Sequence, residues 1–171
     1  MAKYDANKDL VMADNIMLFI VTGDTATITG LTSFTSANTQ VVAFGTSCSV
    51  EASQDTIDTS NKMSCRWQNN LAGRANYTVS SDSLYTNATG ALSYDALLKA
   101  MVAGDAIAWC QAAVKDGTDC SGDSTFVIDP AQIIAGGKGL ITSLSLTAGN
   151  NEAAQCSITI TGSGPLFEKG A

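Results

Sequence analysis

The chain has 171 residues, of which 45% are apolar and only 15% are charged. This length fits one domain, and the apolar share is large enough to bury a core, which excludes a disordered chain. The formal net charge is −7, and no two basic residues are adjacent, which excludes a conventional nucleic-acid-binding module because such modules place many cations against phosphates.

The first part of the chain predicts a polar arm followed by short strands. Residues 1–13 lack apolar periodicity and indicate an arm without the pattern of a secretory leader. The apolar run at 15–21 predicts a buried strand and is far too short to span a bilayer. Residues 25–39 are β-prone but contain a glycine, so they predict either a hairpin or a decorated loop. Alternation over 40–52 predicts another strand.

The most unusual segment is the polar stretch at 52–74, which has almost no hydrophobic periodicity. It predicts a long loop, and long loops in small domains are usually functional or disordered. Trp67 lies in its middle. Two interpretations of this side chain stay open: a latch folded back on its own domain, or an anchor inserted into a neighbouring subunit.

A strand and a helix follow the polar stretch. Alternation over 76–86 predicts a strand with one buried face. Residues 93–104 predict an amphipathic helix that begins after Ser93 as N-cap and ends at Gly104. Its apolar side chains recur at helical spacing and form one stripe: Tyr94, Leu97, Leu98, Met101 and Val102.

The last part of the chain predicts three more strands. Residues 106–114 form the first of them, with Trp109 in the core. The glycine-rich run at 135–140 lacks the spacing of a phosphate-binding loop and predicts a turn. Strands are predicted at 140–148 and 155–162, each with a small hydroxyl-bearing face. The alternation in the earlier of these two strands places three leucines on one face: Leu140, Leu144 and Leu146.

Together these segments predict a mainly β fold with one domain over residues 1–171. The predicted architecture is an antiparallel β-sandwich or barrel with one flanking α-helix, an extended loop at 52–74 and an N-terminal arm.

The residues that carry chemistry in most active sites are scarce. The absence of histidine excludes His-based catalytic triads and zinc sites, and the five cysteines, without a C-x-x-C pair, predict reduced thiols packed as small apolar groups. The acidic run at 115–124 lacks the spacing of a calcium loop, so a solvated turn is favoured over a calcium site. Asp55 and Asp58 have no partner base. The sequence therefore predicts no enzyme, no catalytic residue, no cofactor and no metal site.

Several motifs occur in a fixed order from the polar stretch to the end of the chain. Asp-Thr-Ser-Asn-Lys at 58–62 is followed by Trp67, by Ala-Gly at 72–73 and by the strand that ends in Leu-Tyr at 84–85. The helix and the closing strands, which end in Thr-Gly-Ser-Gly at 161–164, complete the order. This order resembles that of the major tail tube proteins of tailed bacteriophages. Residues 63–66, 25–39 and 115–136 depart from it.

The resemblance implies a structural virion protein that forms stacked, generally hexameric rings. The stack is a hollow tail tube, through which the genome leaves the capsid. The implied fold is two packed antiparallel sheets with a flanking helix, joined edge to edge between subunits. The implied partners are copies of the chain itself, other tail and neck or baseplate proteins, and DNA that passes without specific binding; no membrane is involved. The implied location is the virion tail, after assembly in the cytoplasm of the bacterial host.

Two sets of site residues are expected on this basis. The first belongs to the polar stretch and is expected to bridge to a neighbouring subunit or ring: Asp58, Thr59, Ser60, Asn61, Lys62, Arg66, Trp67 and Leu71. The second belongs to hydroxyl-rich strand faces and is expected to line the lumen, where negative charge lets DNA slide: Thr78, Ser80, Asp82, Ser143, Ser145, Thr159 and Thr161.

Two other classes compete with this interpretation. A carbohydrate-binding or adhesive β-sandwich module would explain the polar strand faces, but it predicts an exposed aromatic platform, whereas these faces are mostly Ser and Thr. A small metal-dependent enzyme would need ligands, and the absence of histidine weighs against it.

Overall fold

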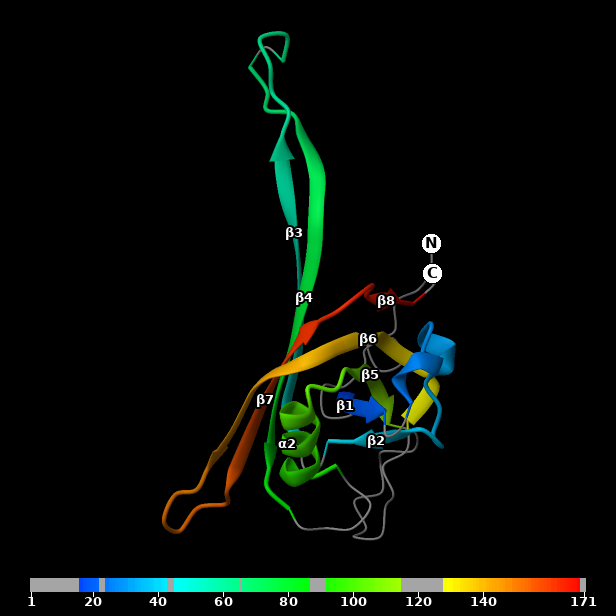
Figure 1. Ribbon diagram of the computed structural model, residues 1–171, viewed down its shortest axis with the longest axis vertical. Coiled ribbons are helices and arrows are strands. Elements are labelled where there is room, and N and C mark those ends of the chain that lie inside the picture. The colour runs from blue at the N-terminus through cyan, green and yellow to red at the C-terminus, as the bar shows by residue number, and fades with distance from the viewer. Residues whose placement is uncertain are drawn as a thin grey trace, which may run out of the picture.

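The computed structural model describes residues 16–21, 24–42, 45–64, 66–86, 92–114 and 128–169. The predicted arm at 1–13 and the acidic run at 115–124 lie outside the described residues. The elements follow in chain order (Figure 1): β1 (Ile16–Val21), the short 3₁₀ helices η2 (Thr25–Thr27) and η3 (Leu31–Ser33), β2 (Thr39–Val41), β3 (Gly45–Asp58), β4 (Asn70–Leu84), α2 (Tyr94–Ala103), β5 (Ile107–Val114), β6 (Ile128–Thr147), β7 (Gln155–Gly162) and β8 (Phe167–Glu168).

The strands form one antiparallel sheet in the order β2-β1-β5-β6-β7-β4-β3, and β8 pairs with β6 beside this path. The long strand β6 pairs with β5 over its first half and with β7 over its second half. The sheet bends along β6, so its two ends face each other across a shared core. The prediction of a mainly β, sandwich-like fold with one flanking helix is confirmed, with one bent sheet where two separate sheets were implied.

The main core lies between the two ends of the bent sheet. It combines Leu18 and Ile20 of β1, Trp109 of β5, and Val79 and Ile160 of the opposite end, all of them buried. The rings of Tyr77 and Trp109 pack with centroids 5.8 Å apart. The predicted core position of Trp109 is confirmed, because its side chain is fully buried.

A second core lies on the other side of β1 and β5. Phe19 of β1 and Cys110 of β5 point into it, and Ile28 and Phe34 from the segment before β2 cover it. Burial on both faces explains why β1 is apolar throughout rather than alternating.

The covering segment at 25–39 is not a hairpin, so the decorated-loop alternative describes it better. Its polar side chains hydrogen-bond locally rather than joining a ladder: Asp24 accepts from the Ala26 amide at 2.8 Å, and the Asn38 side chain accepts from the Thr35 amide at 2.8 Å. Such local bonds compete with strand pairing, which is why a β-prone composition folds here into two 3₁₀ turns.

The predicted turn at 135–140 is wrong, because the whole run lies inside β6. The glycines serve close packing rather than chain reversal. A Cβ on Gly137 would lie 2.5 Å from the Tyr77 hydroxyl, and a Cβ on Gly139 would lie 2.6 Å from the Thr161 carbonyl oxygen. Glycine in a strand interior commonly marks such a close approach.

The predicted grouping of three leucines on β6 is also wrong. A register shift between Ile141 and Ser143 reverses the side on which alternate residues lie. Ile141 therefore lies in the main core, Leu144 packs against it from the same side, and Leu140 points to the opposite face with 43% of its surface exposed.

The predicted helix is confirmed as α2, and Gly104 ends it in the left-handed conformation at φ +71°. Ser93 occupies the N-cap position without a side-chain hydrogen bond to the helix. The predicted apolar stripe is only partly used: Leu97 is buried, whereas Leu98 and Val102 are 38% and 81% exposed.

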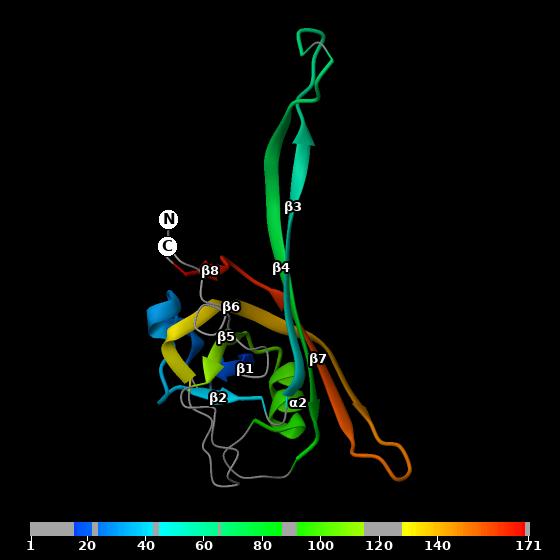
Figure 2. The same ribbon diagram turned by 180° about the vertical axis from the view of Figure 1, so that it is seen from behind.

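The predicted long loop at 52–74 is largely a β-hairpin arm. β3 continues to Asp58 and β4 begins at Asn70, so only residues 59–69 form a loop. Beyond the body both strands are mostly polar on both faces, so they lack the alternation that would have predicted strands, and the sequence therefore predicted a loop. Figures 1 and 2 show the arm projecting along the long axis of the molecule, well beyond the body.

The Tyr77 ring is held so tightly that an added methyl group should destabilise the fold. A Cβ on Gly162 would lie 2.5 Å from ring carbons of Tyr77, whose hydroxyl donates to the Lys138 carbonyl at 2.6 Å. We expect Gly162→Ala to lower the free energy of unfolding by about 1–3 kcal/mol, measured by urea denaturation. Gly30→Ala, with no atom within 4 Å of the added Cβ, is the control. Equal stability of the two variants would contradict this packing.

Candidate assembly surfaces

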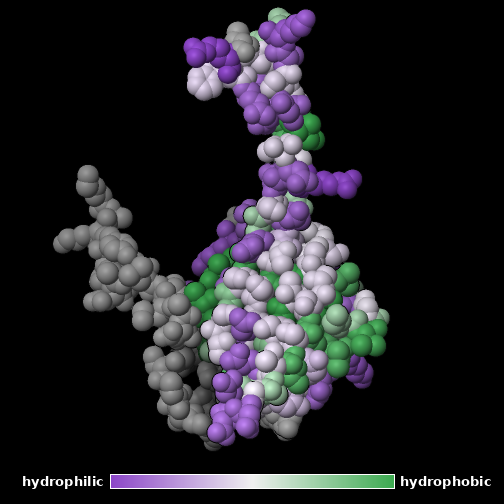
Figure 3. Space-filling view, turned by 90° about the vertical axis from the view of Figure 1, so that its left-hand side faces the viewer, coloured by the Kyte–Doolittle hydropathy of each residue, from purple (hydrophilic) through white to green (hydrophobic). Residues whose placement is uncertain are grey.

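Four adjacent strands present a mostly polar surface on the side away from the main core, interrupted by Leu140, which pairs with Thr161. We call it the hydroxyl face, and Figure 3 views the molecule from this side, where weakly polar, pale residues cover much of the body. The face consists of exposed or half-buried side chains of β3, β4, β7 and β6: Ser47, Ser49, Glu51, Thr78, Ser80, Asp82, Ser143, Ser145, Ser157, Thr159 and Thr161.

The strand register brings all seven predicted lumen residues onto this face. One row runs from Ser80 to Thr159 and on to Ser143, and the next runs from Asp82 through Ser157 to Ser145. Thr78 pairs with Thr161. The sequence-based list omitted the contribution of β3, although Ser47 and Ser49 already alternate with apolar residues there, so the pattern contained the information.

Hydrogen bonds between neighbouring strands hold the hydroxyl face together. Ser49 and Ser80 hydroxyls lie 2.8 Å apart, and the Asp82 carboxylate accepts from Ser157 at 2.6 Å and from Ser47 at 2.9 Å. These bonds lower the pKa of Asp82, with Ser157 as the largest cause. The face thus carries two carboxylates, Asp82 and Glu51, among neutral hydroxyls.

The lowered pKa of Asp82 gives a test of this network. Because the folded-state pKa lies below the ordinary value of 3.8, the stabilisation is fully present above pH 3.8 and is lost as the pH falls through the folded-state pKa. We expect Ser157→Ala to raise the pKa of Asp82 toward 3.8, as measured by NMR titration of its carboxyl carbon. Ser145→Ala, on the same face, is the control; an unchanged pKa in Ser157→Ala would refute the network.

The loop at the end of the arm, residues 59–69, is closed by its own polar groups. We call it the tip. The Thr59 amide donates to the Asn69 carbonyl at 2.8 Å, and the Asn69 amide donates to the Ser60 hydroxyl at 3.0 Å. Asp58 accepts from the Ser60 amide at 2.8 Å, and the pKa of Asp58 is lowered first by the Ser60 hydroxyl and next by this amide. The predicted assembly residues Asp58, Thr59 and Ser60 therefore hold the tip closed.

The arm exposes apolar side chains that its own fold does not bury. Trp67 is 82% exposed, so the latch interpretation is wrong for this chain in isolation and the anchor interpretation remains. Leu71 pairs across the arm with Ile57, and both are more than half exposed. Met63 is 91% exposed. Ile57 and Met63 were absent from the predicted set, because a single apolar residue in a polar run gives no periodic pattern.

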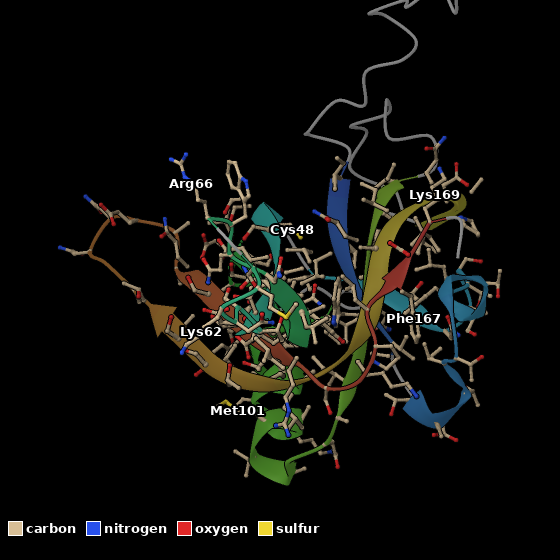
Figure 4. All side chains as sticks on the ribbon, turned by 90° about the horizontal axis from the view of Figure 1, so that it is seen from above. Cys48, Lys62, Arg66, Met101, Phe167 and Lys169 are labelled. Carbon is tan, nitrogen blue, oxygen red and sulfur yellow. The ribbon has the colours of Figure 1, made fainter. Side chains whose placement is uncertain are left out.

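The basic side chains of the arm also lie at its tip. Lys62 and Arg66 are exposed, and Figure 4 shows them on different sides of the tip. All eight predicted assembly residues are thus on the arm, seven of them between Asp58 and Trp67 and the eighth, Leu71, at the start of β4.

Among the unpaired stretches of sheet edge in the described residues, two flank the hydroxyl face. β3 pairs only with β4, which leaves its other edge free. The second half of β6, from Ile141 to Thr147, pairs only with β7, since its pairing with β5 ends at Gly139. Free edges present unpaired backbone N–H and C=O groups and can pair with another chain.

Other predicted sites can be compared with the structure only in part. Within the described ranges no group of three or more Cys, Asp or Glu side chains could hold a metal ion. Cys110 and Cys156 are buried thiols, and burial raises the pKa of the half-buried Cys48 to about 11. Cys65 and Cys120 lie outside the described residues.

No helix in the part of the chain that the structure describes is long and apolar enough to cross a membrane.

A polar sheet face, free sheet edges and a projecting arm with exposed apolar side chains define a structural protein built to join other subunits. Comparison with family profiles identifies the family to which this structural protein belongs. The profile of the phage tail tube protein family matches residues 30–168. The chain belongs to the phage tail tube protein family and is a structural component of the virion tail. A comparison with curated proteins found no match.

Solved tail structures share this fold at low sequence identity. A subunit of the tail of an empty gene transfer agent particle, refined with C6 symmetry, is 15% identical with a TM-score of 0.65, covering 94% of this chain and 99% of its own. The SPP1 tail tube subunit is 11% identical with a TM-score of 0.61, covering 94% and 80%. A subunit from the sheath–tube complex of an extracellular contractile injection system is 13% identical with a TM-score of 0.54, covering 97% and 95%.

Proposed function

We propose that this chain forms hexameric rings that stack into the phage tail tube, with the hydroxyl face lining the lumen. The observation that carries the proposal is the four-stranded hydroxyl face with a free edge on either side, at β3 and at the second half of β6. Pairing β3 of one subunit with β6 of the next closes the sheet into a barrel and removes both edges. Six-fold symmetry is supported by the C6 symmetry of the similar gene transfer agent tail.

The chemistry of the hydroxyl face suits a passage for DNA. Its neutral hydroxyl groups offer no cation to replace the counterions of the phosphates, so they provide no electrostatic driving force for binding. The carboxylates of Asp82 and Glu51, repeated in every subunit, repel phosphates at short range. DNA therefore slides along this surface rather than adhering to it.

The arm supplies contacts beyond the subunit itself. Its free strands project past the body, and its tip exposes Trp67, a residue type that is enriched at interface hot spots. We assign the arm, with the predicted residues from Asp58 to Leu71, to contacts with a neighbouring ring.

Electron microscopy of the purified protein tests the proposed function. Negative staining should show rings and tubes of uniform width, and cross-sections should show six-fold symmetry. Monodisperse monomers at high protein concentration would refute it. Binding to other tail, neck or baseplate proteins follows from the same role and is tested by adding those proteins to preformed tubes.

The proposed role is structural and needs no catalysis. The alternative of a carbohydrate-binding or adhesive module gains no support, because the hydroxyl face presents Ser, Thr and carboxylates rather than an aromatic platform. Binding of tubes to a glycan array would favour that alternative.

A further inference from the structure

Helix α2 carries apolar side chains that the rest of the described chain does not cover. Leu98 and Val102 are one turn apart on the same side of the helix, and Val102 is 81% exposed. Asp95 precedes them on this side, and Asp105 follows the end of the helix; both carboxylates are exposed. We call these four residues the helix stripe. Lys99 lies beside the helix stripe. The two carboxylates of the stripe outnumber this one cation, so the net charge of the region is negative.

The tip of the arm has the opposite charge. Residues 59–69 contain Lys62 and Arg66 and no acidic residue, giving +2, whereas the whole chain carries −7. The rest of the chain therefore carries −9, and the tip is attracted to other copies of this chain. Trp67 and Met63 add exposed apolar surface to the same tip.

The tip and the helix stripe are well separated along the subunit. Figures 1 and 2 show the tip at one end of the long axis and α2 in the half of the body farthest from it. Contacts between two different surfaces of identical subunits produce an open stack rather than a closed dimer. Subunits stacked along this axis bring the tip of one toward the α2 side of the next.

We propose that the tip of each arm docks on the helix stripe of a subunit in the adjacent ring, with Trp67 and Met63 against Leu98 and Val102 and with Lys62 or Arg66 near Asp105. This inference rests on the proposed function, because it requires stacked rings, and it names the surface that receives the arm. Among the exposed apolar side chains outside the arm in the described residues, only Leu98 and Val102 are adjacent and flanked by carboxylates; the others are Ile134, Leu140 and Leu146.

Photo-cross-linking from α2 tests the docking directly. The full-length chain is prepared with p-benzoylphenylalanine at position 102, assembled, checked for tubes by electron microscopy, irradiated, and analysed by mass spectrometry. We expect adducts with peptides from 59–69 in tubes and none in dissociated subunits. Adducts that join position 102 only to other segments, in normal tubes, would overturn the inference and leave the proposed function intact.

A matched pair of helix variants measures how much the stripe contributes. Val102→Ser should raise the protein concentration needed for tube growth by about tenfold, because it removes a buried apolar contact at each junction. Ala103→Ser, which changes the adjacent exposed residue on another side of α2, should leave that concentration unchanged. Equal behaviour of the two variants would overturn the inference. If the unmodified chain forms neither rings nor tubes, the proposed function fails and the inference falls with it.

Discussion

Replacing the tip, residues 59–69, by Asn-Gly is expected to give a folded subunit that no longer forms tubes. Asp58 and Asn70 are the last paired residues of the arm, so a two-residue turn can join them without disturbing the ladder. The change removes Trp67, Met63 and both cations of the tip. Interface aromatics of this kind contribute about 2–4 kcal/mol each, and a ring presents several tips at once, so loss of tubes should be complete. Sedimentation and negative-stain microscopy measure the result.

Two comparisons make the tip experiment specific. Thermal unfolding of the shortened chain should match that of the original, because the tip contributes no residue to either core. Trp67→Ser alone should weaken assembly in the same direction, which separates the role of the aromatic side chain from that of arm length. Normal tubes from the shortened chain would show that the tip has no part in stacking.

The second large effect is expected from adding cations to the hydroxyl face. Ser80, Thr159 and Ser143 form one row across β4, β7 and β6, so Lys at all three positions places a basic row in each subunit. If this face lines the lumen, short duplex DNA should be retained inside the tubes and protected from nuclease. The retention should fall steeply between 50 and 200 mM salt, since binding by about 6–10 phosphate contacts weakens by roughly 10³–10⁵ over that range.

A control with the same added charge distinguishes the lumen from the outer surface. Lys at Thr32, Ser36 and Ala37 places three cations on the exposed segment that covers the second core. DNA bound by this control should remain open to nuclease. Strong, salt-sensitive retention of DNA by unmodified tubes would contradict the proposed lumen chemistry, and so would equal nuclease sensitivity of the two variants.

The sequence predicted the hydroxyl face because strand alternation is a local property. In β7, and in β4 from Tyr77 to Ser80, the polar and apolar residues alternate, so a period of two located all of Thr78, Ser80, Thr159 and Thr161. In β6 the same rule placed Leu140 in the wrong layer, because one irregular residue between Ile141 and Ser143 reverses the alternation after it. The partner strand determines such a shift, and its effect is visible only when both strands are paired.

The remaining failures share a cause in contacts that are distant in sequence. Glycines such as those at 135–140 are common in turns, so the local sequence favours a turn. Their role in β6 depends on Tyr77, about 60 positions earlier, which packs against them. The arm has no buried face within its own subunit, so its strands carry no apolar alternation that a sequence could show. The apolar side chains predicted on one side of α2 are there, but sequence periodicity could not divide them into those that pack inward, such as Leu97, and those that stay exposed, such as Val102.

The continuity of β6 has a mechanical consequence. This one strand belongs both to the body, through its pairing with β5, and to the four-stranded hydroxyl face, through its pairing with β7, and no loop separates the two parts. A force applied along the face is therefore resisted by many backbone hydrogen bonds loaded together, and it reaches the main core without passing through a hinge. We expect a wall in which the hydroxyl face lines the lumen, as proposed, to be stiff, because within the described residues β6 joins this face to the body without a loop.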